Sequence, residues 1–498
     1  MSVSDDRIPV IIGVGELNDR PDIPTEGMSS PALMAAALEL ADQDAGGGWL
    51  ARIQSLDIVN QISWPVDNIV AELSQRLGIA PTHIATGVPS GEAPVRYLND
   101  AANRIARGDF EVASVTCGEA LRTAAALSRA GTAGGPSKEM MRARAETMAS
   151  PLRLKYGLLT PTDIYPLYEA GTRAAWHMSF ADAQAESARI WSDFSDVAAD
   201  NPNAWIRRRR APDEITTAGP DNRPIAHPYT KLMVANSAVN QGAALILTSL
   251  SKARAMGVPE HRLIYVWAGA GAQEPDNFLL RDGFDHSSSM MAVLQRTLEI
   301  NRLDAAAFDH VELYSCFPCI PKMARRIIGW PEAKPASVIG GLTFAGGPIA
   351  NYMSHAAAGM VRKLREAGEF GLLYGNGGYV TKNHAIILSR RVPPADLLDR
   401  DYNVQELADT LRGPIPKLLV GYAGPARIES YTVIYDRDGA PRYGAVIGRT
   451  PVDERFVARV APEDGETIAR LVSGAEEPVG MPGQARLDGH GLVEWRFG

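Results

Sequence analysis

Three short stretches of the chain concentrate residue types that could do chemistry. Residues 309–321, DHVELYSCFPCIP, carry a hydroxyl at Tyr314 and thiols at Cys316 and Cys319. Two glycine-rich stretches follow, IGGLTFAGGPIANY at residues 339–352 and LLYGNGGYVTKNHA at residues 372–385. A tyrosine hydroxyl can donate a proton, a thiolate can act as a nucleophile, and glycine loops allow a close approach of backbone N–H groups. These stretches are therefore the first candidates for an active site.

The cysteines indicate no metal site. The chain has three of them, and Cys316 and Cys319 form a lone C-x-x-C, with Cys117 far away in sequence. A zinc site would need further ligands at suitable spacing, and none stands out. We expect no metal and, in a cytoplasmic chain, reduced thiols.

Composition and charge exclude several classes of protein. The 498 residues are 45% hydrophobic and 22% charged, with a formal net charge of −8. A nucleic-acid-binding or membrane-surface protein needs a basic face, so we expect neither kind of partner. The N-terminus lacks the basic and apolar regions of a signal peptide, and no apolar run approaches the roughly 20 residues that span a bilayer. We expect a cytoplasmic protein that acts on a small molecule.

The order of predicted elements indicates an α/β fold. Strand-like and helix-like runs alternate over the first 120 residues, which predicts a mostly parallel sheet covered on both faces. The predicted strands are residues 8–15, 56–62 and 110–118, and the predicted helices begin at Ser29, at Asp67 and at Val95. A helical, loop-rich insertion at about residues 121–230 interrupts this rhythm, and a second run of the same order follows. We therefore predict two similar halves, residues 1–255 and 256–400.

The last part of the chain is different in kind. SYTVIYDRDGAPRYGAVIGRT alternates apolar residues around Asp438 and Gly439, which is a strong hairpin signal. RFVARV and LVEWRFG read as further strands. We predict a small β-rich domain over residues 410–498.

The order and spacing of these motifs resemble the thiolase superfamily, in particular sterol-carrier-type thiolases and mycobacterial thiolase-like proteins. Besides the three stretches above, NPNAW (residues 201–205), NSAVNQGAA (residues 236–244) and ANRIARGDFEVASVTCGEA match family segments in the correct order. The resemblance covers about residues 7–395. It implies a five-layered αβαβα fold, an OB-like extra β domain, and coenzyme A or an acyl-CoA as the bound substrate, as in acetyl-CoA acetyltransferases.

The catalytic side chains of the family are replaced at each position. Classical members use a cysteine in C-x-S-G, an Asn or His in the second loop, a histidine in G-H-P and a cysteine in C-x-G. Here these positions hold Val88, Tyr314, Gly347 and Gly375. Thiolysis needs an acyl-enzyme and hence an activated thiolate, which valine cannot supply. Classical thiolase activity is therefore not expected.

Two other side chains are candidate nucleophiles. Ser90 follows Val88 by two residues and could act if the register shifts, but it needs a positioned base. Cys316 matches the cysteine of the family's H-D-C-F motif, which ordinarily has a structural role.

One reaction of the fold needs no covalent intermediate, namely aldol or retro-aldol cleavage of a 3-hydroxyacyl-CoA. It requires a base for the 3-hydroxyl group and an oxyanion site for the enolate. Thiolase-related aldolases resemble this chain in placing tyrosines at such positions, so Tyr314 is the candidate acid or base. His355 and His384 are candidates to tune its pKa. The alternative is that Tyr314 fills the volume of a lost catalytic centre and that both histidines are structural.

Further candidates concern substrate binding. Loops that present N–H groups to a thioester oxygen need residues without Cβ, although plain turns need them too. The candidates of this kind are Gly346, Gly347, Gly377 and Gly378. Arg207 and Arg208 begin a run of four arginines that could hold the phosphates of CoA or form ion pairs with Asp213 and Glu214.

Two functions of different classes follow from these observations. The first is an acyl-CoA-binding enzyme that acts on C–C bonds without a cysteine nucleophile. The second is a catalytically inactive CoA-binding or scaffold protein. By resemblance to thiolases the chain is a homodimer through its core or, with the extra domain, a monomer.

Overall fold

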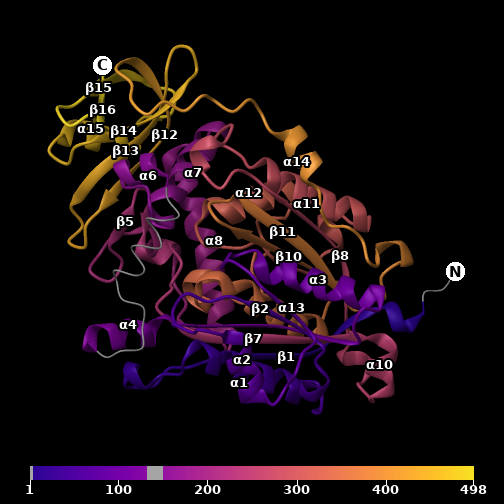
Figure 1. The fold of residues 1–498 in the computed structure, drawn as a ribbon. Helices are drawn as coiled ribbons and strands as arrows, with labels where there is room; N and C mark the ends of the chain where they lie inside the picture. The colour runs from indigo at the N-terminus through magenta and orange to yellow at the C-terminus, as the bar shows by residue number, and fades with distance from the viewer. Residues whose placement is uncertain (1–3, 132–149) are drawn as a thin grey trace.

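The computed structural model describes residues 4–131 and 150–498, so residues 132–149 of the predicted insertion lie outside the described residues. The core is a nine-stranded sheet with the strand order β3-β2-β4-β7-β1-β8-β11-β10-β9 (Figure 1). Its first five strands are β3 (His83–Thr86), β2 (Ser55–Val59), β4 (Val112–Ala120), β7 (Asn240–Ser249) and β1 (Pro9–Asn18). The other four are β8 (Ile264–Gln273), β11 (Lys382–Ser389), β10 (Phe370–Gly377) and β9 (His310–Glu312). These two groups meet through only two register pairs, Val10 with Tyr265 and Ile11 with Ile264.

The prediction of a mostly parallel sheet is wrong. Only β2–β3, β2–β4 and β9–β10 are parallel, whereas the other five neighbouring pairs are antiparallel. Alternating elements predict parallel strands only where each helix crosses back to the adjacent strand. Here β7 returns beside β4 and β1 after the long insertion, and a short turn joins β10 directly to β11, so these strands run antiparallel to their neighbours.

Helices complete the five layers that the resemblance implies. α3 (Ala93–Arg107) and α13 (Tyr352–Glu366) lie between the two groups of strands and contact both. α1 (Ser30–Asp44) and α2 (Ile69–Leu77) cover the outside of the first group, and α11 (Ser288–Asn301) and α12 (Cys319–Ile328) cover the second (Figure 1). The ends of α1 and α3 follow the sequence signals. Ser29 caps α1 by accepting from the N–H of Ala32, and Gly108 ends α3 with φ 79°.

The predicted insertion is largely helical. It contains α4 (Leu121–Ala130), α6 (Pro151–Tyr156), α7 (Pro161–Ala175), α8 (Phe180–Asp200), α9 (Pro212–Thr216), β5 (Pro224–Ala226) and β6 (Tyr229–Thr230). Two short helices lie elsewhere, α10 (Leu250–Ala255) after β7 and α14 (Gln405–Leu411) before the C-terminal strands. No helix within residues 4–131 and 150–498 is both long and apolar enough to cross a membrane.

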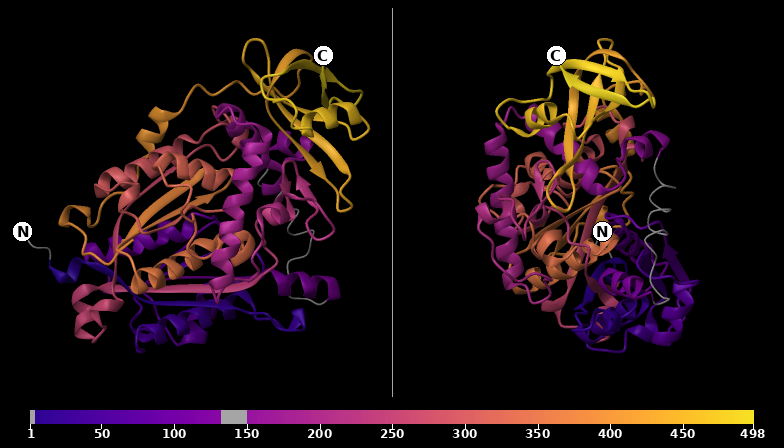
Figure 2. Two further views of the ribbon diagram at one scale, coloured as in Figure 1. Left: turned by 180° about the vertical axis from the view of Figure 1, so that it is seen from behind. Right: turned by 90° about the vertical axis from the view of Figure 1, so that its left-hand side faces the viewer.

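The C-terminal strands form a closed barrel at one end of the molecule (Figure 2). They are β12 (Gly424–Tyr435), β13 (Pro441–Arg449), β14 (Arg455–Val460), β15 (Pro482–Leu487) and β16 (Val493–Phe497), with α15 (Gly465–Val472) after β14. β12 pairs with both β13 and β15, which closes five strands into a ring, as expected of an OB-like domain. The predicted hairpin at Asp438 and Gly439 joins β12 to β13, and β5 of the insertion adds to β12 through Ala226 and Ile434.

Candidate active site

The loop before α3 meets the end of β10 at a close approach that requires a glycine. A Cβ atom at Gly377 would collide with the side-chain oxygens of both Ser90 and Glu92. The Ser90 hydroxyl donates a hydrogen bond to the Glu92 carboxylate, and Glu92 is buried. Ser90 therefore has the carboxylate partner that the sequence analysis did not find, although the two residues are only two positions apart.

A second glycine brings Tyr314 to the same place. A Cβ atom at Gly91 would collide with the Tyr314 hydroxyl and with the backbone oxygen of Asn376. The loop before α3, the loop after β9 and the end of β10 thus meet around Ser90, Gly91 and Gly377. We call this meeting point, together with Glu92, Tyr314 and Asn376, the loop junction.

Tyr314 has an unusual backbone and a buried side chain. Its φ is +37°, a region that non-glycine residues rarely adopt and that is common at functional sites. The side chain is 6% exposed, and its ring packs edge-on against Tyr352 with 5.9 Å between centroids. Burial, with the neighbouring Cys316 and Glu92, raises the pKa of Tyr314 well above its ordinary value. The hydroxyl is therefore protonated and can donate, but it is no base.

Asn376, between two glycines of β10, has an amide without a full set of partners. Its Oδ1 accepts a hydrogen bond of 3.1 Å from the Tyr165 hydroxyl of α7. Its Nδ2 is buried beside the Cys316 thiol, a weak acceptor, and has no hydrogen-bond partner among the described residues. Neither Asn376 nor this role of Tyr165 was predicted, because only the fold brings together residues so far apart in sequence.

The Tyr352 ring that packs against Tyr314 is itself held by Glu312. The Tyr352 hydroxyl donates to Glu312 Oε1 at 2.8 Å, and Ser337 Oγ and the N–H of Val338 donate to Oε2 at 2.8 and 3.0 Å. Glu312 is completely buried, and burial raises its pKa to about 7. The carboxyl thus fixes the aromatic wall behind Tyr314.

The other candidate nucleophile, Cys316, is poorly suited to catalysis. Its thiol is buried beside Tyr165, and burial raises its pKa to about 12, so no thiolate forms near neutral pH. Val88, at the nucleophile position of the family, is 64% exposed. Of the candidate nucleophiles, only Ser90 lies next to a carboxylate.

The two predicted histidines have partners other than Tyr314. His355 Nδ1 lies 2.9 Å from Glu16 Oε1, and His384 Nε2 lies 3.1 Å from Asn99 Oδ1. Burial lowers the pKa of His384 to about 3, so its ring is neutral. Neither histidine hydrogen-bonds to Tyr314 within the described chain, and an influence of these rings on the pKa of Tyr314 stays a prediction. Local sequence could not reveal these two partners, because Glu16 and Asn99 lie hundreds of residues away from the histidines that they contact.

Buried polar atoms without partners gather where α13 begins. In the described part of the chain, no hydrogen bond reaches the side-chain amide of Asn351, Ser354 Oγ or His355 Nε2. Gln241 Oε1, against which Gly346 packs, is likewise unpaired. Buried polar groups normally have partners, so these atoms are available to hydrogen-bond to a water or a ligand.

The four predicted binding glycines have different surroundings. Gly377 faces Ser90 and Glu92, as described above. Gly346 (φ 111°) and Gly378 (φ 63°) have positive φ angles that glycine adopts without strain, so the local chain geometry accounts for a glycine at each position. The N–H of Gly347 donates to the Asn236 oxygen at 2.8 Å. That N–H is already used within the protein, so it does not offer a free donor to a thioester.

A cavity of about 460 Å³ reaches the loop junction from one side. Its lining includes Glu92, Arg96, Lys382, His384 and Tyr402. In the register of β10 and β11, His384 lies opposite Gly375, the position of the second family cysteine. This cavity therefore gives a polar ligand access to the Glu92 carboxylate.

Arg207 and Arg208 lie on the surface rather than in this cavity. Arg208 is 3.8 Å from Glu214, and Arg207 Nε donates to the Ala199 oxygen at 3.4 Å. No group of three or more His, Cys, Asp or Glu side chains in the described ranges is arranged to hold a metal ion.

Solved structures of thiolases and thiolase-like proteins share this architecture. A monomeric SCP2-thiolase like protein type 1 from Mycobacterium smegmatis is 28% identical, covers 100% of both chains and has a TM-score of 0.83. The Ltp2-ChsH2(DUF35) aldolase is 17% identical over 78% of this chain and 98% of its own, with a TM-score of 0.59. Human mitochondrial 3-ketoacyl-CoA thiolase is 12% identical over 78% of this chain and 99% of its own, also with a TM-score of 0.59.

The C-terminal barrel makes the assignment more specific. Residues 404–490 match the family model of the thiolase-like protein type 1 additional C-terminal domain. The predicted resemblance to the thiolase superfamily and to mycobacterial thiolase-like proteins is thereby confirmed. No curated protein matches the chain.

Proposed function

We propose that the chain binds an acyl-CoA and makes or breaks a C–C bond next to the thioester, without a covalent cysteine intermediate. The thiolase fold and the loop junction at its catalytic-loop positions support a thioester substrate. The protonated thiol of Cys316 argues against an acyl-cysteine. Arg207 and Arg208, exposed at the surface, are the proposed contacts for the phosphates of CoA.

The observation that carries the proposal is the unpaired amide of Asn376. A buried N–H donor without a partner costs free energy, of the order of 1–3 kcal/mol, unless something accepts its hydrogen bond. At the loop junction it lies among groups that a C–C bond reaction needs: a carboxylate at Glu92 and a protonated hydroxyl at Tyr314. Fixed donors that stabilise a developing enolate are commonly the largest single contribution to catalysis.

The retro-aldol direction assigns one role to each group. The Glu92 carboxylate takes the proton of the 3-hydroxyl group, and the C2–C3 bond breaks as a carbonyl forms at C3. The electron pair of that bond passes to the thioester enolate, whose oxygen accepts from Asn376 Nδ2. Tyr314 then gives its proton to C2, which yields an acyl-CoA and a free aldehyde or ketone. The aldol direction reverses each step.

The test is Tyr314→Phe, assayed by turnover of 3-hydroxyacyl-CoAs and by calorimetric titration with CoA. We expect turnover to fall by about 10²-fold or more, because the proton donor is lost. The Kd for CoA should stay within about twofold, because the ring and its packing on Tyr352 remain. Glu92→Gln should also abolish turnover. Unchanged turnover in both variants, or an acyl adduct on Ser90 or Cys316, would contradict the mechanism.

A second function, CoA binding without catalysis, is favoured by one observation. Tyr314 is only 6% exposed, so substrate must displace neighbouring groups before it reaches the hydroxyl. The same assay separates the two functions. A protein that binds CoA without catalysis gives a binding signal in the calorimetric titration but does not turn over 3-hydroxyacyl-CoAs.

We also propose that the chain is a monomer. The relative from Mycobacterium smegmatis, which is described as monomeric, matches along the whole chain, including the barrel. Sedimentation at micromolar concentration should give a single species of 53.6 kDa. A species of twice that mass would support the predicted homodimer instead. Cytoplasmic location stays a prediction.

A further inference from the structure

The turn between β10 and β11, residues 378–381, follows the loop junction directly and has a strained backbone. Val380 has φ +61° and is completely buried. A β-branched residue in the left-handed region is a genuine outlier, and such strain persists only where the surroundings enforce it. Asn376 and Gly377 of the loop junction are the residues immediately before this turn, so whatever enforces the strain also fixes them.

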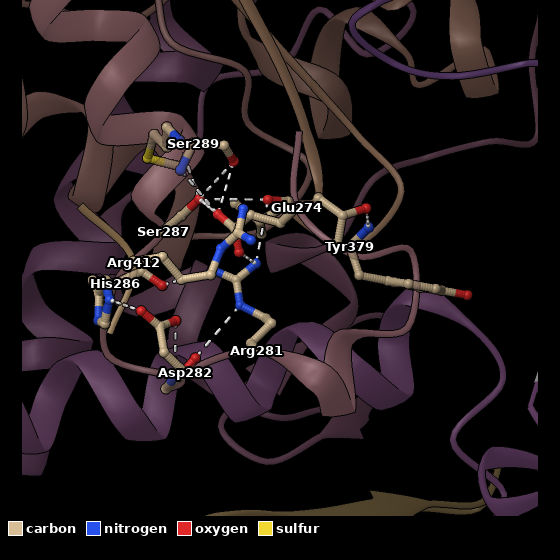
Figure 3. Close-up of polar contacts among 12 residues, drawn as sticks. Glu274, Arg281, Asp282, His286, Ser287, Ser289, Tyr379 and Arg412 are labelled. Atoms are coloured by element: carbon tan, nitrogen blue, oxygen red, sulfur yellow. Dashed lines mark hydrogen bonds and ion pairs between the residues drawn. The ribbon is translucent and has the colours of Figure 1, made fainter. Parts of the chain in front are cut away.

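A buried polar network that includes Glu274, Arg281 and Ser287 (Figure 3) holds the Val380 carbonyl. It accepts hydrogen bonds from Asn383 Nδ2 at 3.2 Å, Arg281 Nη1 at 3.3 Å and Ser287 Oγ at 3.5 Å. Arg281 is in turn paired with Glu274 at 2.8 Å, and both side chains are almost fully buried. Glu274 also accepts a hydrogen bond from Ser287 at 2.6 Å, which fixes the carboxylate that pairs with Arg281.

The C-terminal barrel holds the segment that carries Arg281. Arg455 of β14 donates to the backbone oxygens of Leu279 and Arg281, at 2.7 and 2.5 Å. Arg449 of β13 donates to the Asp282 oxygen at 3.0 Å. Glu429 of β12 pairs with both arginines, which orients them toward the core.

The barrel also contacts the helix on the other side of the turn. Ser430 Oγ donates to the Leu167 oxygen of α7 at 2.6 Å. From the same helix, the Tyr168 hydroxyl donates to the Tyr379 oxygen at 2.8 Å, and Tyr165 donates to Asn376. Two routes, one through Arg281 and one through α7, thus run from the barrel to the turn.

We infer that the C-terminal barrel is a positioning element of the loop junction, with Arg281 and Arg455 as positioning residues. The barrel fixes the segment around Arg281, and Arg281 holds Val380 in its left-handed conformation. This fixes Asn376 and Gly377 against the loop before α3. The consequence for ligand binding rests on the proposed function, whereas the consequence for the turn does not.

The test is Arg281→Lys, read by hydrogen exchange of the peptide that covers residues 377–383 and by the Kd for an acyl-CoA. Lysine keeps the charge beside Glu274 but lacks the planar five-donor guanidinium that reaches Glu274, the Val380 oxygen and the His286 oxygen together. We expect amide exchange in the turn to rise by about tenfold or more while exchange in β1 is unchanged. The Kd should weaken by about tenfold. Arg302→Lys, an exposed arginine paired with Asp396, is the matched control and should change neither quantity.

A second substitution separates positioning from general damage. Val380→Gly relieves the backbone strain, because glycine adopts φ +61° freely, and it also removes a completely buried side chain. In the Arg281→Lys protein it should restore the Kd to within about threefold of wild type. Unchanged exchange in the turn of Arg281→Lys overturns the inference, as does a Kd that Val380→Gly fails to restore although the double variant melts no lower than the Val380→Gly single variant. If Arg281→Lys does not fold, Arg455→Lys is read in the same way. If wild type binds no acyl-CoA, the proposed function fails and the exchange data alone decide the inference.

Discussion

Two buried polar regions of this molecule differ in how completely their polar atoms are hydrogen-bonded within the chain. At the contact between core and barrel, the buried charges of Glu274, Arg281 and Arg455 all have partners within the chain. Around the loop junction and the start of α13, Asn376 Nδ2, both side-chain polar atoms of Asn351 and Ser354 Oγ have none in the described residues. A satisfied network fixes one structure, whereas unpaired buried groups need a water or a ligand. The difference separates what holds the fold from what is available for function.

The largest loss of stability is expected from Arg455→Met, which removes a buried charge from the contact between core and barrel. The substitution leaves the backbone oxygens of Leu279 and Arg281 without their donor and removes one of the two cations that neutralise Glu429. Breaking a buried pair in this way costs about 3–5 kcal/mol of unfolding free energy. Urea unfolding measures the loss.

Arg437→Met, in the exposed turn between β12 and β13, is the control and should change stability by less than about 0.5 kcal/mol. A loss below about 1 kcal/mol for Arg455→Met would mean that the barrel is only loosely attached.

The carboxyl of Glu312, behind the loop junction, gives a prediction about pH. Its pKa is raised to about 7 by burial, so the folded protein binds its proton more tightly than the unfolded chain does. Stability is therefore lost as pH rises from about 4.5 to 7, by up to about 3 kcal/mol. Glu312→Gln removes this titration and keeps an acceptor for Tyr352. Its stability relative to wild type should increase between pH 5 and pH 8, as measured by urea unfolding.

Asp309→Asn is the control for this pH dependence. Burial opposes ionisation of Asp309, but the N–H groups of Glu369 and Phe370 outweigh it and lower the pKa of the carboxyl. Its stabilising contribution is present above the ordinary pKa and is lost only as pH falls, so this variant should show no slope between pH 5 and pH 8. A flat profile for Glu312→Gln as well would mean that Glu312 is ionised in the folded protein.

A matched pair of serine substitutions compares the two regions directly. Ser287 Oγ donates to Glu274 at 2.6 Å and accepts from the N–H of Met290 at 3.2 Å, so Ser287→Ala should cost about 1–3 kcal/mol. Ser354 Oγ is equally buried but lies only beside the Cys117 thiol, so Ser354→Ala should cost less than about 0.5 kcal/mol. Equal losses in thermal unfolding would show that an unseen partner, such as an ordered water, satisfies Ser354.

Residues whose role depends on local chain geometry could be predicted from the sequence. Gly108 at the end of α3 and the Asp438–Gly439 hairpin are signals within a few residues, and both appear where expected. Tyr314 was placed in a catalytic loop by the order of motifs. The structure adds that the preceding strand, β9, ends at Glu312 and that Tyr314 takes a left-handed backbone.

Residues whose role depends on long-range contacts could not be predicted. The hydrogen-bond partner of Asn376 comes from α7, its neighbour Cys316 comes from the loop after β9, and the partner of His355 comes from β1. Local signals likewise do not fix the direction of β7, which decides the antiparallel middle of the sheet. The fold class therefore followed from patterns and motif order, whereas the polar contacts of the site required the structure.

The smallest effect on stability is expected at Arg207 and Arg208, outside both regions. Their side chains are exposed, and the pair of Arg208 with Glu214 is long at 3.8 Å, so replacing both by alanine should change the unfolding free energy by less than about 0.5 kcal/mol. If they hold the phosphates of CoA, its affinity should fall about fivefold at low ionic strength, and the difference should shrink with added salt. Arg209→Ala is the control, because that guanidinium is already engaged by Asp196 and Asp200. An equal loss of affinity in Arg209→Ala would mean that the four arginines act only through their combined positive charge and do not bind the phosphates individually. The cavity lined by Arg96 and Lys382 would then be the candidate site for CoA.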